Sequence, residues 1–237
     1  MKFLKTLLVA LILATIVIFI LFSKEIKTSL IETFAATKQT SAKVNRKPLD
    51  VPLLKQMDRP KLYNGCEVTS LAMILNYSGY DVTKNELAQK VKRVPLQYKN
   101  GLKGNPNDGF VGDMEKGPGL SVYHGPIYEL ATSYAGDKVL DLTGSKLEKI
   151  YEQLNQSRPV WVITTVNFSP VKSMKTWNTP TGKVDVTYKV HSVAITGYDQ
   201  KYVYVNDPYG YKNRRTDRIK FEKSWKQMGR QAIVIAD

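Results

Sequence analysis

The chain contains little cysteine and little histidine, which argues against a disulfide-stabilised protein and against a zinc-binding one. Its 237 residues include one cysteine and two histidines. A single cysteine cannot form an internal disulfide, and one thiol with two distant imidazoles does not make a zinc site. No run of carboxylates has the spacing of a calcium loop, and no glycine-rich phosphate-binding motif follows a strand. We therefore expect neither a metal nor another cofactor.

Acidic residues are also scarce relative to basic ones. The chain has 35 Lys and Arg residues against 21 Asp and Glu residues, which gives a formal net charge of +14. The basic residues are scattered and no nucleic-acid-binding signature is present, so we do not expect a nucleic-acid partner. A basic domain outside the cytoplasm is attracted to an anionic membrane surface or to an anionic cell-wall polymer. We therefore expect one of these two anionic surfaces to be a partner of the protein.

The N-terminal 23 residues have the pattern of a membrane-targeting segment. Two lysines precede an apolar run over residues 7–22 that contains neither a charge nor a proline. The run is long for the apolar part of a signal peptide and slightly short for a spanning helix. The best small-residue cleavage site, Thr33-Phe34-Ala35, lies well downstream. We expect residues 1–23 to anchor the chain in the cell membrane with the remainder outside; cleavage and secretion is the alternative.

The remaining sequence divides into a linker and one domain. Residues 24–47 are polar and have no sustained core pattern, which is typical of a linker. Residues 48–237 carry enough apolar side chains for one domain of ordinary size. Helical patterns fill its front half and strand patterns its back half, which predicts an α+β fold with a mainly antiparallel sheet.

Helix and strand signals place the elements of this domain. Helices are expected over residues 65–77, from a Thr83/Glu86 capping box to about residue 92, over 125–136, from a Ser145/Glu148 cap to about residue 156, and over 221–228. Strands are expected over residues 159–166, 184–198, 202–206 and 231–236. Residues 94–125 form a long segment without periodicity, and loops of this length in a compact domain are often functional.

The cysteine lies at the start of the first predicted helix of the domain. Gly65-Cys66-Glu67 begins this helix. A helix N-terminus favours negative charge, so we expect the thiolate of Cys66 to be accessible near neutral pH. The alternative is that Cys66 is a small buried apolar residue with no chemical role.

A histidine and an aspartate lie on consecutive predicted strands. Alternation places His191 on one face with Val193, and Asp207 on one face with Val205. A three-residue turn at 199–201 pairs Val193 with Asp207, which leaves Asp207 diagonal to His191 at about 7–8 Å between Cα atoms. A two-residue turn would put Asp207 on the opposite face. The alternative is a buried histidine paired with a turn-forming Asp-Pro.

These residue types match the needs of nucleophilic catalysis. Cys66 would attack a carbonyl carbon, His191 would accept and return the proton, and Asp207 would orient the imidazole. Gln56, ten positions before the cysteine, is the candidate oxyanion donor, together with the backbone N–H of Cys66. Two other residues compete for the roles of base and orienting group. His124 is the rival base, but no carboxylate at strand spacing orients it, and Asn206 faces away from His191 in the expected register.

Several segments together resemble the bacterial C39-like cysteine peptidases of the papain-like superfamily. The matching segments, in family order, are Gly65 to Met73, Asn105-Pro106 through Gly109 to Gly112, Arg158-Pro159-Val160, His191-Ser192-Val193, Gly197-Tyr198-Asp199, and Asn206-Asp207-Pro208 with Gly210. The resemblance implies a papain-like fold, Cys66 as nucleophile, His191 as base, Asp207 as third member and Gln56 at the oxyanion position. It is closest to the stand-alone branch, because the chain has no room for a transporter.

Processing after a double glycine is not carried over from the transporter-fused branch. In that branch the glutamine and cysteine are closer together than Gln56 and Cys66, and an acidic residue usually precedes the cysteine where this chain has Gly65. The sequence therefore predicts an exported, membrane-anchored cysteine peptidase that acts on a peptide or protein substrate. A cell-wall peptide amidase or transpeptidase-like enzyme with the same triad is one alternative, and a surface-binding module without catalysis is another.

Overall fold

The computed structural model describes residues 25–27 and 47–236. The chain divides into two units, Met1–Val44 and Asn45–Asp237. Of the first unit only residues 25–27 are described, and they are helical. The predicted anchor over residues 1–23 and almost all of the predicted linker lie outside the described residues. Within the described residues, none of the helices is both apolar enough and long enough to cross a membrane.

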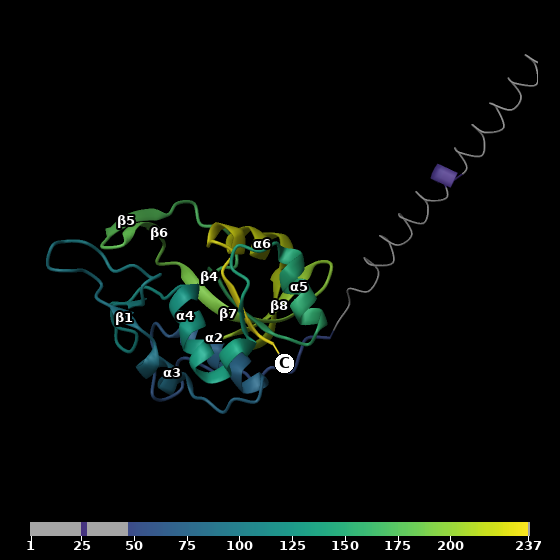
Figure 1. The fold of residues 1–237 in the computed structure, drawn as a ribbon, viewed down its shortest axis with the longest axis horizontal. Helices are drawn as coiled ribbons and strands as arrows, with labels where there is room; N and C mark the ends of the chain where they lie inside the picture. The colour runs from purple at the N-terminus through teal and green to yellow at the C-terminus, as the bar shows by residue number, and fades with distance from the viewer. Residues whose placement is uncertain (1–24, 28–46, 237) are drawn as a thin grey trace, which may run out of the picture. The chain divides into compact units, whose positions relative to one another are not determined.

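A six-stranded antiparallel sheet forms the centre of the second unit (Figure 1). In spatial order its strands are β3 (Val139–Asp141), β10 (Ala232–Ile235), β4 (Val160–Thr165), β7 (Val190–Tyr198), β8 (Tyr202–Asp207) and β9 (Tyr211–Asp217). Two smaller sheets flank it. Strand β1 (Arg93–Val94) pairs in parallel with β2 (Phe110–Val111), and β5 (Lys175–Thr179) forms a hairpin with β6 (Gly182–Val186).

Helices cover both faces of the central sheet. They are α2 (Cys66–Tyr77), α3 (Lys84–Lys90), α4 (His124–Ala135) followed by the 3-10 turn η1 (Gly136–Lys138), α5 (Leu147–Asn155) and α6 (Arg218–Gln227). Figure 1 shows α2, α3 and α4 on one side of the sheet and α5 and α6 on the other. The structure therefore has the α+β, papain-like arrangement that the sequence predicts, with α2 packed against the middle strands.

Alternation along β4 explains why helices are needed on both sides. All six residues of β4 are buried. Trp161 and Ile163 belong to the apolar cluster beneath α2 and α4, while Val160 and Val162 point to the opposite face, as successive side chains of a strand must. The Trp161 indole N–H also donates to the carbonyl of Glu67 on α2 at 3.0 Å. This contact ties the first turn of α2 to the centre of the sheet.

The structure confirms some local predictions and contradicts others. The Thr83/Glu86 capping box is present at the start of α3. The predicted Ser145/Glu148 cap is wrong, because α5 begins at Leu147 and no side chain caps it. The predicted strand over residues 184–198 is two strands, since β6 ends at Val186 and β7 begins at Val190. Strands β3, β5 and β9 were not predicted, because they are short or polar and their pairing depends on tertiary partners.

Candidate active site

Cys66 is the first residue of α2, and the chain enters this helix through a tight turn. Gly65 is the N-cap residue and makes no side-chain cap. A Cβ added at Gly65 would collide with the side chain of Leu62, which is itself buried. The glycine is therefore required by close packing. As the first helical residue, Cys66 has a backbone N–H without an intrahelical acceptor, so this donor is available to an oxyanion.

The Cys66 thiol is buried, and this changes the electrostatic expectation. Burial raises the pKa of the thiol well above its usual value, and the neighbouring Glu67 carboxyl raises it further. A backbone hydrogen bond from Ser192 acts in the opposite direction. The expectation that the helix N-terminus makes the thiolate accessible near neutral pH is therefore not met by the position of Cys66 alone. Loss of hydration and a nearby carboxyl outweigh the helix dipole.

His191 and Asp207 are joined by a buried hydrogen bond. Nε2 of His191 lies 2.9 Å from Oδ1 of Asp207, and both side chains are almost fully buried. The predicted contact between the two residues is therefore present. Asn206 points elsewhere, as expected, because its side-chain amide donates to the carbonyl of Val51 at 2.9 Å and accepts from the N–H of Asn213.

The register that brings His191 and Asp207 together arises differently from the prediction. Ala194 pairs with Asn206, so continuing this register by one residue places Asp207 opposite Val193, as expected. The connection, however, is a tight two-residue turn, closed by a hydrogen bond from the Asp199 N–H to the Tyr202 carbonyl at 2.8 Å. An irregularity in β7 between Ile195 and Gly197 supplies the extra residue. Because a bulge shifts the pairing by one position, it restores the face that the tight turn would have reversed.

Further groups that the sequence did not indicate surround the histidine–aspartate pair. The Tyr209 ring stacks on the His191 imidazole with 4.6 Å between ring centroids, and the Phe168 ring meets it edge-on at 6.3 Å. Arg214 on β9 donates to Oδ2 of Asp207 at 2.9 Å, and its guanidinium lies 4.9 Å from the Phe168 ring centroid. Arg214 had no sequence signal, because its role depends on the pairing of β9 with β8.

These contacts keep Asp207 ionised. Burial by itself would raise the pKa of this carboxyl. The hydrogen bond to His191, the charge of His191, the N–H of Tyr209 and the Arg214 guanidinium together lower it below the usual value. An ionised Asp207 accepts from Nε2–H of His191, which leaves Nδ1 as the nitrogen that exchanges a proton. Nδ1 is buried and has no hydrogen-bond partner among the described residues.

Gln56 is buried against the turn that leads to Cys66, and its side-chain amide is engaged there. Nε2 donates to the carbonyls of Leu62 and Tyr63 at 3.2 and 3.1 Å. Its Oε1 is buried without a partner in the described part of the chain. In this arrangement Gln56 shapes the turn that leads to Cys66. It would serve as an oxyanion donor only if Nε2 released one of the two carbonyls.

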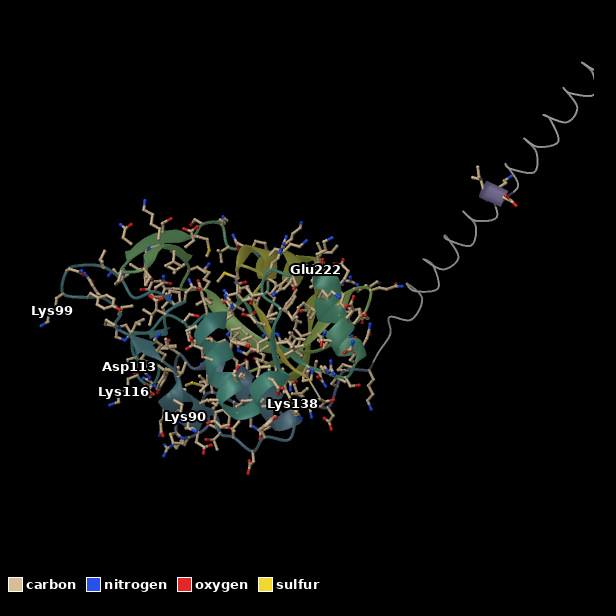
Figure 2. The ribbon with its side chains drawn as sticks, viewed as in Figure 1. Lys90, Lys99, Asp113, Lys116, Lys138 and Glu222 are labelled. Atoms are coloured by element: carbon tan, nitrogen blue, oxygen red, sulfur yellow. The ribbon has the colours of Figure 1, made fainter. Side chains whose placement is uncertain are left out.

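The long segment over residues 94–125 braces the same turn. The backbone N–H of Asn64 donates to the carbonyl of Met114 at 2.9 Å, and the side-chain amide of Asn64 donates to the carbonyl of Asp113 at 3.2 Å. Figure 2 shows Asp113 and Lys116 near the β1 side of the unit, and Lys99 at the outer tip of the loop that follows β1. The part around residues 113–114 is thus hydrogen-bonded to the turn that precedes Cys66, while the part near Lys99 extends away.

His124 forms a second histidine–carboxylate pair away from this site. Its Nδ1 lies 2.6 Å from Oδ2 of Asp141 on β3, so the expectation that no carboxylate orients His124 is wrong. Asp141 was missed because β3 was not predicted. Strand β3 is separated from β7 by β10 and β4, which corresponds to about 14 Å at the usual strand spacing. No group of three or more metal-ligating side chains is found within residues 25–27 and 47–236.

Comparison with known proteins agrees with this fold. Residues 48–233 match the Peptidase_C39 like family. The uncharacterized protein YvpB of Bacillus subtilis (strain 168) is 67% identical over 201 residues, which cover 85% of this chain and 80% of that protein. A crystal structure from Bacillus anthracis, provisionally assigned as a C39-like peptidase, superposes with a TM-score of 0.78 at 42% identity and covers 81% of this chain and 98% of its own. The chain therefore belongs to the C39-like peptidase family.

Proposed function

We propose that the protein is a cysteine peptidase that hydrolyses a peptide or other amide bond through Cys66, His191 and Asp207. One observation carries the proposal. The buried His191 has Nε2 bonded to Asp207 and leaves Nδ1 without a partner among the described residues, while the next residue, Ser192, contacts the Cys66 thiol through its backbone. A thiol, an imidazole and a carboxylate in this order are the parts of a nucleophilic triad.

The reaction follows from these positions. Nδ1 of His191 takes the proton of Cys66, and the sulfur attacks the carbonyl carbon of the substrate. The backbone N–H of Cys66 donates to the oxyanion that forms. His191 then gives its proton to the leaving amine, which yields a thioester on Cys66. Water, deprotonated by His191, hydrolyses the thioester, releases the acid product and returns the thiol.

We also propose that the catalytic unit works outside the cell and is held to the cell membrane by residues 1–23. The apolar run over residues 7–22, the preceding lysines and the net charge of +14 support this location. The substrate is then a peptide or protein at the cell surface. An anionic membrane or wall polymer would be the second partner, attracted by the net positive charge of the chain.

A substrate screen with matched variants tests the peptidase proposal. The full chain is incubated with a general peptide library and, separately, with purified cell-wall peptides, and the products are identified by mass spectrometry. We expect cleavage by the wild type and none by Cys66→Ala or His191→Ala, with circular dichroism showing that both variants are folded. Cleavage that survives in Cys66→Ala would contradict the proposal. Products from wall peptides alone would favour the amidase or transpeptidase-like alternative.

One observation favours a surface-binding module without turnover. The buried Cys66 thiol has a raised pKa, which is the state expected of a structural cysteine. Iodoacetamide alkylation across the pH range separates the two functions. A reactive thiol at a pH below that of a free thiol, lost in His191→Ala, supports the peptidase. An alkylation rate that rises with pH as it does for a free thiol, and that does not depend on His191, supports the binding module.

A further inference from the structure

The Glu67 carboxyl is buried directly beside the nucleophile. It is the second residue of α2, and its side chain is fully buried. Oε1 accepts a hydrogen bond from the Ser121 hydroxyl at 2.5 Å and a longer one from the Val122 N–H at 3.4 Å. Oε2 is equally buried and has no hydrogen-bond partner among the described residues. The two oxygens of one carboxyl group therefore have different surroundings.

This asymmetry fits a carboxylic acid better than a carboxylate. A buried carboxylate needs a paired cation or several donors on both oxygens, because the loss of hydration is otherwise too costly. Oε1 accepts from two neutral donors, and the other hydrogen bonds that lower the pKa of Glu67, from the Cys66 thiol and from the Glu67 backbone, are neutral as well, so no cation pairs with the carboxyl among the described residues. A neutral acid places its acceptor oxygen at Oε1 and its proton at Oε2. Burial is the main cause that raises the pKa of Glu67.

The groups that face the Glu67 carboxyl add no positive charge. They are Cys66 on its own helix, Tyr123 just before α4, and Tyr209 between β8 and β9, together with the Ser121 hydroxyl. Burial, followed by the proximity of Glu67, raises the pKa of Tyr123. His191 lies against the ring of Tyr209. The charge of Asp207 raises the pKa of the Cys66 thiol, as that of Glu67 does. An ionised Glu67 would therefore stand in a cluster of acids.

An ionised Glu67 would also oppose the chemistry of the proposed peptidase. After burial, its charge is the largest cause that raises the pKa of Cys66. A carboxylate at this position accepts a hydrogen bond from the thiol, which keeps its proton and therefore stays in its unreactive form. A neutral carboxyl removes the repulsion and turns the same oxygen, Oε2, into a hydrogen-bond donor toward the sulfur.

We propose that Glu67 is held as a neutral carboxylic acid whose Oε2 proton is directed at the Cys66 sulfur, so that the thiolate forms only while Glu67 keeps its proton. The inference rests on the proposed function, because it makes Glu67 a positioning residue for the same thiol. Ser121 orients the carboxyl by donating to Oε1. Glu67 itself does not touch the substrate carbon or the leaving group.

The proton balance gives the inference a measurable signature. In the reactive state Glu67 is neutral, Cys66 is a thiolate and His191 is an imidazolium. When Glu67 loses its proton to solvent, the proton on His191 returns to sulfur, which leaves a carboxylate, a thiol and a neutral imidazole. Reactivity therefore falls as pH rises through the titration of Glu67. It rises again only where the thiol ionises without help.

The test combines infrared spectroscopy with alkylation kinetics on the full chain. The infrared difference between wild type and Glu67→Gln at neutral pH should contain the carbonyl band of a protonated carboxyl. The iodoacetamide rate of the wild type should fall by about tenfold on the alkaline side before rising again. Glu67→Gln keeps a neutral donor and should lose this fall, whereas Glu67→Ala should lose the low-pH reactivity. Glu129→Gln, at an exposed position on α4, is the matched control and should change neither readout.

The outcomes separate this inference from the proposed function. A carboxylate band for Glu67, together with a reactive thiol that depends on His191, overturns the inference and leaves the peptidase proposal in place. A protonated band with ordinary, His191-independent reactivity overturns both the positioning role and the proposed function. If Glu67→Gln does not fold, Ser121→Ala gives the spectroscopic test, because loss of its donor should shift the protonated-carboxyl band. An unshifted band would overturn the assignment.

Discussion

At His191 the two ring nitrogens have different surroundings, and this difference determines what the residue is able to do. Nε2 is bonded to an ionised carboxylate, and Nδ1 has no partner among the described residues. A stacked tyrosine and an edge-on phenylalanine limit rotation of the ring. Phe168 has a positive φ of 52°, unusual for a bulky residue, and such strain is concentrated at functional sites. The imidazole is therefore held in one orientation.

Arg214 is predicted to stabilise the ionised form of Asp207. The folded-state pKa of Asp207 lies below its unfolded value, so its contribution to stability is present above the unfolded value of about 3.9 and is lost as pH falls through the folded value. We expect Arg214→Gln to lower the free energy of unfolding by about 1–3 kcal/mol near neutral pH. The loss should shrink in acid, where Asp207 is protonated in both proteins.

Urea unfolding at neutral and acid pH measures this effect. Arg215→Gln is the matched control, because Arg215 lies over the Tyr202 ring, 5.7 Å from its centroid, on the same strand. We expect the control to change the free energy of unfolding by less than Arg214→Gln near neutral pH. Equal losses in the two variants, or a loss in Arg214→Gln that does not depend on pH, would show that Arg214 does not act through Asp207.

At the scale of elements, Cys66 is positioned by a turn that two other segments hold through hydrogen bonds. Gln56 bonds the turn through two carbonyls, and the segment over residues 94–125 bonds it through Asn64. The side chain of Asp113 closes its own turn by accepting from the N–H groups of Glu115 and Lys116, each at 2.8 Å. The part of the long segment nearest Cys66 is thus structural support. Its hydrogen bonds hold it in place against the turn, which is the behaviour of a fixed support and not of a lid that opens and closes.

Hydrogen–deuterium exchange should distinguish a brace from a lid. We expect the hydrogen-bonded amides of Asn64, Asp113 and Gly117 to exchange slowly, because each donates to a backbone carbonyl. Alkylation of Cys66 should leave their protection unchanged. The amides of Lys99, at the outer tip of the loop, and of Asn100 are the internal comparison and should exchange faster, because within the described residues neither donates to a backbone carbonyl. Increased protection over residues 112–119 after alkylation would instead indicate closure of a lid.

The entry into α2 predicts a sharp contrast between two glycines. Gly65→Ala places a Cβ against Leu62 in the core, and overpacking of this kind costs about 1–3 kcal/mol. Gly125→Ala adds a Cβ that meets only an ordinary contact, in a helix where alanine is favoured over glycine by about 1 kcal/mol. Thermal unfolding should therefore show a lower Tm for Gly65→Ala and an unchanged or higher Tm for Gly125→Ala. The same direction of change in both variants would contradict the packing argument.

At the scale of the whole molecule, the proposed anchor over residues 1–23 and the net charge make separate predictions about membrane association. An uncleaved anchor over residues 1–23 holds the chain through apolar contacts, which salt does not weaken, whereas the charge of +14 acts only through screened electrostatics. We expect the protein to remain with the membrane fraction after a high-salt wash. Its N-terminal residue should be Met1. A mature N-terminus at Ala36 or Thr37, or release by salt alone, would contradict the anchor.

Local sequence signals were enough to predict the main helices, the long strands and the residue types of the candidate site. Helical spacing identified α2 and the Thr83 cap of α3, and the continuous β-branched run identified β4 as a central strand. These signals are local, since propensity, capping and burial on both faces are properties of neighbouring residues. The scarcity of cysteine and histidine then limited the nucleophile to Cys66 and the base to His191 or His124.

How these residues meet depends on long-range packing between strands and helices. The contact between His191 and Asp207 depends on a bulge in β7 that the local sequence pattern does not predict. The contact of Arg214 with Asp207 depends on β9, a polar strand that exists because it pairs with β8. The charge state of Cys66 was decided in the same way. The helix N-terminus favours a thiolate, but burial beside Glu67 opposes it more strongly. Hydration and the dielectric around a group are set by every element packed against it, so they cannot be read along one strand or helix.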